Sequence, residues 1–291
     1  MPEGDTVWRT AHRLDQALAG APLTTCDLRW PELSTLDFRG ATTLEVVSRG
    51  KNLLHRLDNG VTIHSHLRME GQWRVESTPT LTSRALANLQ LRAVIGTATW
   101  TALGLRLGDL HVVPTDQEHT LVGHLGPDVL GADWDAPEAA ARVGSFAGTV
   151  GAALLDQRHL AGVGTMYASE ALFLERLGPW TPAASLTDDR RLALVERAQR
   201  LVDAGRRSVV QSTTGSDRRG ETHFVHGRSG RPCRRCGGTI RVAMIGDPPR
   251  ERTMFYCPTC QGGFGPTDDR RPQQPLGAMR GPRAYGRREG R

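Results

Sequence analysis

The sequence predicts a two-domain α+β protein, in which an N-terminal antiparallel β-sandwich precedes a mainly helical domain that ends in a four-cysteine zinc finger. Three observations predict this class. Short apolar runs separated by turn residues fill the chain to about residue 114, helix-like segments follow, and two C-x-x-C steps come last. The expected boundaries are 1–130 for the sandwich, 131–228 for the helical domain, 229–265 for the finger and 266–291 for a basic, disordered tail.

The first expected element is an amphipathic helix over residues 7–19. Asp5 or Thr6 can cap its start and Gly20 stops it. Its apolar positions share one face: Val7, Ala11, Leu14 and Leu18. Because Met1-Pro2-Glu3-Gly4 stands directly before this helix, the terminal amine lies beside the positive end of a helix dipole, which favours a neutral, nucleophilic amine.

Strands are expected through the rest of the first domain. The apolar runs that indicate them cover residues 44–47, 53–57, 61–63, 89–95 and 110–113. Asn59-Gly60 suits a tight hairpin turn and joins the strand of Lys51 to the strand that ends at His66. The pattern therefore favours an antiparallel sandwich or barrel.

The second domain begins after a break marked by Pro127, Gly131 and Pro137. Helices are expected over residues 138–143, 148–156, 165–177 and 188–204. Between two of them, Gly162-Val163-Gly164 can direct backbone N–H groups at a phosphate, although most glycine-containing turns between helices serve only to turn the chain.

Four cysteines, Cys233, Cys236, Cys257 and Cys260, form the strongest local signal. Their spacing in a reducing compartment indicates one tetrahedral Zn²⁺ with no open position, hence a structural role. Arginines crowd around them and suit phosphates, with a solvated basic face as the alternative: Arg228, Arg231, Arg234, Arg235, Arg241, Arg250 and Arg252. The fifth cysteine, Cys26, lies in a strand-like segment and is expected to be an inert buried thiol.

The charge balance is basic, with 37 Lys and Arg against 31 Asp and Glu and a pI near 9.5. It favours a polyanionic partner, either a nucleic acid or an anionic membrane surface. No apolar run could span a bilayer and no secretory signal is visible, so a cytosolic protein is expected, with a monomer as the default. Lys51 is the single lysine and hence a candidate for chemistry that arginine cannot perform, unless codon bias alone left it there.

Taken in order, Pro2-Glu3-Gly4, Arg49-Gly50-Lys51, the Gly162–Gly164 turn and the four-cysteine finger resemble the formamidopyrimidine-DNA glycosylase/endonuclease VIII family over residues 2–263. The resemblance implies a β-sandwich, a helix-two-turn-helix domain and a zinc finger around a DNA cleft. It also implies a bifunctional glycosylase and AP lyase of base excision repair. Its partner would be damaged double-stranded or bubble DNA, and its location the bacterial cytoplasm, in association with the nucleoid.

The same resemblance implies the catalytic roles. Pro2, exposed once Met1 is removed, would attack C1′ of the damaged nucleotide and form a Schiff base, followed by β/δ-elimination. Glu3 would act as general acid and base, with a helix-start carboxylate as the alternative. Lys51 would lie across the cleft, balance the phosphate charge and donate a proton.

DNA contacts are also implied by the resemblance. His66–Gly71 is similar to the family's intercalation loop, with Met69 as the wedge and Arg68 beside the orphaned base, whereas a core methionine is the alternative. Arg252 matches the finger arginine that grips phosphates. Gly164 and Thr165 match a phosphate site, but the family usually has asparagine at Thr165, so that contact is weaker, lost or replaced by water.

The expected lesion is an oxidised pyrimidine. Pro2-Glu3-Gly4 resembles the endonuclease VIII branch, and residues 212–224 leave little room for the lesion-capping loop of the purine-directed branch. Arg68, Glu70 and Asp5-Thr6 depart from that branch. Two other functions stay open: a silent damaged-DNA-binding protein, suggested by Thr165, and an enzyme that uses an N-terminal proline as a general base, which leaves the finger unexplained.

Overall fold

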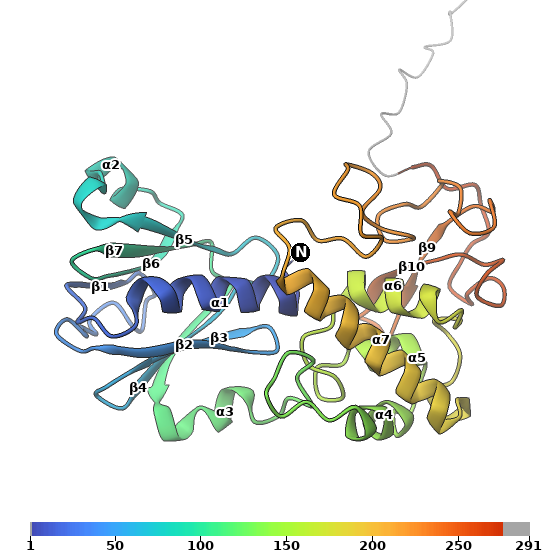
Figure 1. Cartoon of the computed structure of the whole chain (residues 1–291), viewed down its shortest axis with the longest axis horizontal. Helices are drawn as coiled ribbons and strands as arrows, with labels where there is room; N and C mark the ends of the chain where they lie inside the picture. The colour runs from blue at the N-terminus through green and yellow to red at the C-terminus, as the bar shows by residue number, and fades with distance from the viewer. Residues whose placement is uncertain (1, 276–291) are drawn as a thin grey trace, which may run out of the picture.

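The computed structural model describes residues 2–275 and divides them into two lobes that meet near the N-terminus (Figure 1). The N-terminal lobe contains two four-stranded antiparallel sheets and helix α1, and the C-terminal lobe contains helices α4 to α7 and the hairpin β9–β10. The expected sandwich, helical domain and cysteine cluster are confirmed. Within the described residues, no helix has both the length and the apolarity required to span a membrane.

Helix α1 spans Gly4–Leu18 and begins three residues earlier than its apolar pattern predicts. It starts early because Glu3, in extended conformation, supplies the capping position in place of Asp5 or Thr6. The predicted apolar face is buried and packs in the sandwich core: Val7, Ala11, Leu14 and Leu18. The N-terminal end of α1 therefore points out of the sandwich toward the helical lobe (Figure 1).

The two sheets of the sandwich enclose one core. One has the order β2-β3-β4-β8, with strands Thr43–Arg49, Asn52–Leu57, Val61–His66 and Asp109–Pro114. The other has the order β1-β6-β7-β5, with strands Thr25–Leu28, Leu91–Gly96, Trp100–Leu105 and Gln72–Ser77. Short helices α2 (Ser83–Leu86) and α3 (His119–Val122) lie in connections.

The register of β2 and β3 determines where Lys51 lies. Arg49 pairs with Asn52, so Gly50 and Lys51 form the tight turn between the strands and not a strand position. Gly50 has φ +58°, a left-handed conformation that glycine adopts without strain. A Cβ on Gly50 would lie 3.2 Å from the side chain of Ala161, so this turn contacts the helical lobe directly.

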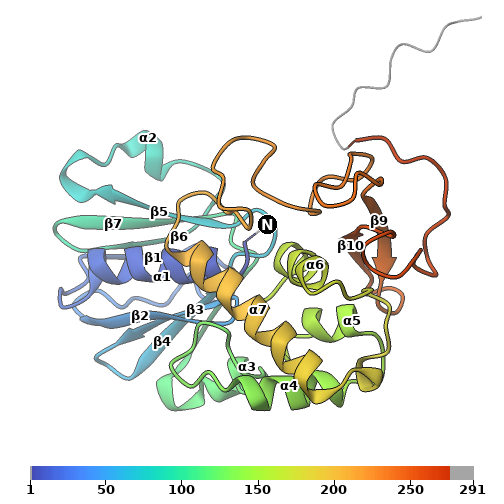
Figure 2. The ribbon, with the colours of Figure 1, turned by 45° about the vertical axis from the view of Figure 1, so that its right-hand side comes forward.

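The helical lobe is organised around α6. Its helices are α4 (Ala136–Gly144), α5 (Val150–Leu155), α6 (Thr165–Leu174) and α7 (Asp188–Arg206). Every residue of α6 from 165 to 173 is buried, because α5, α7 and strand β10 all pack against it. Figure 2 shows α6 between α7 and the hairpin of β9 (Arg241–Ile245) and β10 (Arg252–Tyr256).

The chain after Gly265 differs from the sequence prediction. Disorder was expected from residue 266, yet residues 266–275 pack on the hairpin and Asp268 is buried. This segment has almost no apolar residues, so composition predicts disorder, whereas its order comes from polar contacts that composition does not reveal. The rest of the predicted tail, 276–291, lies outside the described residues.

Candidate active site

The centre of the candidate site is the carboxylate of Glu3, which is fully buried against the start of α6. Its Oε2 accepts hydrogen bonds from the amides of Gly164 (2.8 Å) and Tyr167 (3.3 Å), and its Oε1 accepts one from Met166 (2.8 Å). These amides belong to the first turn of α6, where helical N–H groups lack partners within the helix. Glu3 thus joins the N-terminal segment to the helical lobe.

Lys51 reaches the same point from the sandwich. A Cβ on Gly164 would lie 2.6 Å from Cδ of Glu3 and 2.9 Å from Nζ of Lys51, so only glycine leaves room for both groups. Gly164 therefore matters here for its missing side chain. The structure brings together three residues that are far apart in the sequence.

Burial and charge shift the protonation of both groups. Burial raises the pKa of Glu3, and the Lys51 ammonium and the three amides offset only part of that rise. Burial lowers the pKa of Lys51, the Glu3 carboxylate offsets part of the change, and the charge of Arg252 lowers it further. Each group is therefore easier to convert to its neutral form than in water, a condition that suits proton transfer.

Pro2 adjoins Glu3 and is half-buried where the lobes meet. Gly4, two residues after Pro2, donates its amide hydrogen to the carbonyl of Gly162 (2.9 Å). Gly162 has φ +95°, which requires glycine, and a Cβ on Gly4 would lie 3.1 Å from its backbone. This close backbone contact holds Pro2 beside the 162–164 turn, while Met1 lies outside the described residues.

Two side chains that sequence reasoning missed hold these turns. Asp128 is buried and accepts hydrogen bonds from the amides of Gly50 (2.7 Å) and Leu130 (3.0 Å). Gln157 accepts one from the amide of Gly162 (3.0 Å) and donates one to the carbonyl of Val163 (2.8 Å). Neither belongs to a motif, although Asp128 follows the Pro127 that marks the domain break.

Glu170 is the third missed side chain and orders the segment between α7 and the finger. It is fully buried and accepts hydrogen bonds from the consecutive amides of Phe224 (2.9 Å), Val225 (2.7 Å) and His226 (2.8 Å). The hydroxyl of Thr213 also donates to it. The sequence signal that could have identified Glu170 is an acidic residue within the apolar stretch that forms α6.

Thr165 begins α6 and is 4% exposed. Of the four amides from Gly164 to Tyr167, the Thr165 amide is the one that does not donate to Glu3. Within residues 2–275, neither this amide nor the Thr165 hydroxyl has a hydrogen-bond partner. The start of α6 therefore retains two donors.

The predicted wedge lies in a separate loop, between β4 and β5. Met69 is 67% exposed, which excludes the core alternative. Its neighbours both form ion pairs near the β7–β8 connection: Arg68 with Asp109 at the start of β8 (2.7 Å) and Glu70 with Arg106 just after β7 (3.1 Å). These two ion pairs flank Met69 at the loop tip.

Arg252 is exposed at the start of β10, and its charge acts on Lys51. Its guanidinium contacts only carbonyls of its own hairpin among the described residues, those of Arg250 (3.4 Å) and Glu251 (3.3 Å). A groove of about 1050 Å³ separates the hairpin from the α4–α5 region, and Arg158 and Arg250 also line it. Asp156, which pairs with Arg158, and Asp247 line the same groove, so its lining carries charges of both signs.

The four cysteines converge as one cluster. Their Sγ atoms all lie within 4.8 Å of one another, with Cys233–Cys260 at 4.0 Å and Cys236–Cys257 at 3.5 Å. Four sulfur ligands at about 2.3 Å from a tetrahedral metal lie roughly 3.8 Å apart, so this arrangement is positioned for one metal ion. Cys233 and Cys257 also pack with Phe173 and Phe255, which attaches the cluster to α6.

Comparison with known proteins gives one consistent result. The model of the formamidopyrimidine-DNA glycosylase N-terminal domain matches residues 1–107, and that of its H2TH domain matches residues 125–216. The chain is 48% identical to a probable endonuclease 8 2 of Streptomyces coelicolor over 267 residues, which covers 91% of this chain and 96% of that protein.

Two further similarities agree. The chain is 42% identical to the DNA-(apurinic or apyrimidinic site) lyase Nei2 of Mycolicibacterium smegmatis, over 90% of this chain and 99% of that protein. The fold matches the formamidopyrimidine-DNA glycosylase of Lactococcus lactis solved with DNA containing an AP site, with a TM-score of 0.75 and 21% identity. That match covers 89% of this chain and 99% of the solved chain, and it concerns the fold alone.

Proposed function

The chain belongs to the formamidopyrimidine-DNA glycosylase and endonuclease VIII family, and from that membership we propose that it is a bifunctional DNA glycosylase and AP lyase of base excision repair. The observation that carries the proposal is the meeting of Glu3, Lys51 and Gly164 beside Pro2. The names of the relatives describe glycosylases and lyases, so a silent damaged-DNA-binding protein is not favoured.

Pro2 is the nucleophile in this proposal, after Met1 has been removed. The lone pair of its secondary amine forms a bond to C1′, the glycosidic bond breaks, and the base leaves with the electron pair of the broken bond and takes up a proton. Opening of the sugar ring then gives a cationic Schiff base. Loss of the C2′ proton with the 3′ phosphate, and of the C4′ proton with the 5′ phosphate, breaks the strand on both sides.

Glu3 and Lys51 move the protons. Because its pKa is raised, Glu3 can hold a proton at the sugar and release it there, as ring opening requires. Lys51 has a lowered pKa and stands beside Glu3, so it can donate a proton and still balance phosphate charge in its protonated form. Arginine could not exchange a proton in this way.

The partner is damaged DNA, double-stranded or in a bubble, bound between the lobes by a monomer in the bacterial cytoplasm and at the nucleoid. The unpartnered amide and hydroxyl of Thr165 can donate to one phosphate, in place of the usual asparagine amide. Arg252 contacts a neighbouring phosphate, and Met69 fills the space of the extruded nucleotide while Arg68 faces the orphaned base. Oxidised pyrimidines are the proposed substrates.

We infer that the four thiolates hold one Zn²⁺. Four sulfur donors without an open position suit a structural metal, which here ties β10 to the Cys233–Cys236 turn.

Borohydride trapping tests the proposal. Purified protein, with loss of Met1 verified by mass, is incubated with duplexes that carry an abasic site, thymine glycol or 8-oxoguanine, beside a Pro2→Ala control. The proposal predicts a trapped complex with the abasic site and with thymine glycol, and none with Pro2→Ala. Binding to the abasic duplex without any trapped complex would restore the silent recognition protein.

A further inference from the structure

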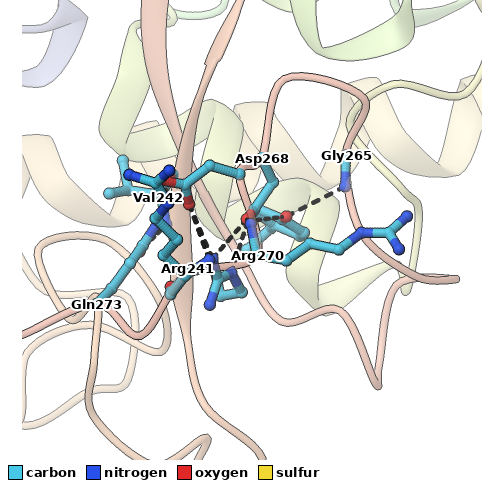
Figure 3. Close-up of polar contacts among 9 residues, drawn as sticks. Arg241, Val242, Gly265, Asp268, Arg270 and Gln273 are labelled. Atoms are coloured by element: carbon cyan, nitrogen blue, oxygen red, sulfur yellow. Dashed lines mark hydrogen bonds and ion pairs between the residues drawn. The ribbon is translucent and has the colours of Figure 1, made fainter.

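Residues 265–275, here called the C-terminal clasp, bind along strand β9 of the finger hairpin (Figure 3). We propose that the clasp positions the hairpin, and thereby Arg252, by contacts that do not involve the metal. This inference rests on the proposed function, because it assigns Arg252 to DNA phosphates. The metal can hold only part of the hairpin: Cys257 directly follows β10, whereas β9 contains no cysteine.

The carboxylate of Asp268 joins both strands of the hairpin at one point. Its Oδ2 accepts hydrogen bonds from Nε of Arg241 on β9 (2.6 Å) and from the hydroxyl of Tyr256 on β10 (2.6 Å). Arg241 and Tyr256 are register partners, so one buried carboxylate bridges a cross-strand pair. The Tyr256 hydroxyl in turn accepts from the amide of Gly265 (3.1 Å), where the clasp begins.

Because the ion pair is buried, loss of either partner is costly. The side chains of Arg241 and Asp268 are 7% and 0% exposed, so neither charge can be rehydrated in place if its partner is lost. The amide of Arg270 donates to Oδ1 of Asp268 (2.7 Å), and Arg241 donates to the carbonyl of Arg271 (2.9 Å). The ion pair is therefore satisfied on both sides from within the clasp.

The clasp also covers the free edge of β9. The side-chain amide of Gln273 accepts from the amide of Val242 (2.8 Å) and donates to its carbonyl (2.8 Å), as a neighbouring strand would. Nearer the hairpin turn, Thr267 donates its hydroxyl to the carbonyl of Met244. Met244 pairs with Thr253, the residue after Arg252, so the contacts extend almost to the base of Arg252.

The chain supplies matched controls at adjacent positions. Asp269 carries the same charge as Asp268, but its side chain is 61% exposed and 3.6 Å from Arg241. Gln274 follows Gln273 and is exposed. Asp268→Asn and Gln273→Ala therefore remove buried or half-buried clasp contacts, whereas Asp269→Asn affects only the longer, exposed pairing with Arg241 and Gln274→Ala changes an exposed side chain of the same type as Gln273.

The experiment uses the full chain loaded with Zn²⁺ and three readouts: hydrogen exchange of the β9 amides, the rate of zinc transfer to a chelator, and affinity for a duplex with an uncleavable abasic analogue. For Asp268→Asn and Gln273→Ala we expect faster exchange at the Val242 amide, which donates to Gln273, and faster zinc transfer. We also expect about ten-fold weaker DNA binding, with the trapping rate at saturating DNA unchanged. Asp268→Glu should recover part of the affinity.

Both control variants should match wild type. Gln273→Ala is a neutral change that leaves the buried ion pair in place. The proposal is overturned if this variant has the same β9 amide exchange rates and the same DNA affinity as Gln274→Ala. Exchange and zinc transfer do not depend on catalysis, so failure of wild type to trap DNA would count against the proposed function and not against the clasp.

Discussion

Two buried carboxylates, Glu3 at the junction of the lobes and Asp268 on the finger, have opposite protonation behaviour. Burial raises the pKa of Glu3, and one ammonium with three amides does not reverse that rise. Burial would also raise the pKa of Asp268, but its bonds from Arg241, Tyr256 and the Arg270 amide outweigh it and lower the pKa. Glu3 lies deeper in the protein than Asp268 and its partners offset less of the effect of burial, so Glu3 is ready to take a proton whereas Asp268 stays ionised.

The partners of the two carboxylates distinguish a group that can exchange a proton from one that keeps its charge. Asp268 meets a guanidinium that keeps its charge and fills its acceptor sites. Glu3 meets a lysine whose own pKa is lowered, so neither partner fixes the charge of the other. Changing Glu3 should therefore reduce activity without loss of stability, and changing Asp268 should do the reverse.

The largest expected effect belongs to Glu3→Gln. Glutamine keeps an oxygen acceptor for the α6 amides but cannot exchange a proton, so single-turnover base excision should fall by about 10³-fold. Because the raised pKa shows that the fold favours the protonated carboxyl, the neutral amide should leave the protein at least as stable at pH 7. Single-turnover kinetics and thermal unfolding on the same samples check both parts. A loss of unfolding free energy larger than the free energy that corresponds to the fall in rate would give Glu3 a structural role like that of Asp268.

Asp268→Asn should show the opposite pattern. It leaves the buried Arg241 charge with only the longer, exposed pairing to Asp269, and loss of one partner of a buried pair costs about 3 kcal/mol of unfolding free energy. Excision at saturating DNA should stay near the wild-type rate. Urea unfolding measures the change, with Asp269→Asn as the control that should stay within about 0.5 kcal/mol of wild type.

The pH dependence of stability should separate the two carboxylates again. The lowered pKa of Asp268 contributes stability above its unfolded value near 3.8, and this contribution is lost as pH falls through the folded pKa. The raised pKa of Glu3 contributes stability below its unfolded value near 4.5, and this contribution is lost as pH rises through the folded pKa. The stability gained by Glu3→Gln should therefore grow from pH 4.5 toward neutral. A gain that shrinks over this range would contradict the assigned directions.

The smallest expected effect belongs to Thr165→Asn, which restores the usual residue of the family. The longer amide donor should strengthen one phosphate contact, by about three-fold in affinity for an abasic-analogue duplex. Thr165→Val, which keeps the shape and removes the hydroxyl, should weaken binding by a similar factor. If Thr165→Val binds as wild type does, the hydroxyl makes no phosphate contact.

Patterns local in sequence predicted much of the fold. The apolar face of α1 and the strands around the Asn59-Gly60 turn rest on short-range periodicity and turn chemistry, which operate within one segment. The spacing of the four cysteines likewise predicts a metal site from the local sequence alone. Glu3 and Lys51 were identified through the motifs of a family, but only the packing of both lobes shows that they share the space left by Gly164.

The parts that sequence reasoning missed act on backbone groups of distant segments. Asp128 reaches Gly50, and Glu170 reaches residues 224–226, by hydrogen bonds to amides, which leave no signature in the residue types of their targets. The clasp was predicted to be disordered because its residues are polar. Its order depends on a buried partner, Arg241, that sequence reasoning had assigned to a phosphate-binding face.

In the proposed mechanism Pro2, held beside Glu3 and Lys51, is the group that bonds to the sugar. The most direct test is mass spectrometry of peptides from the borohydride-trapped complex with an abasic duplex. Lys51 is the single lysine, so the candidate amines are the N-terminus and that side chain. We expect the nucleotide adduct on the peptide that begins at Pro2. An adduct on the peptide that contains Lys51 would contradict the proposed mechanism.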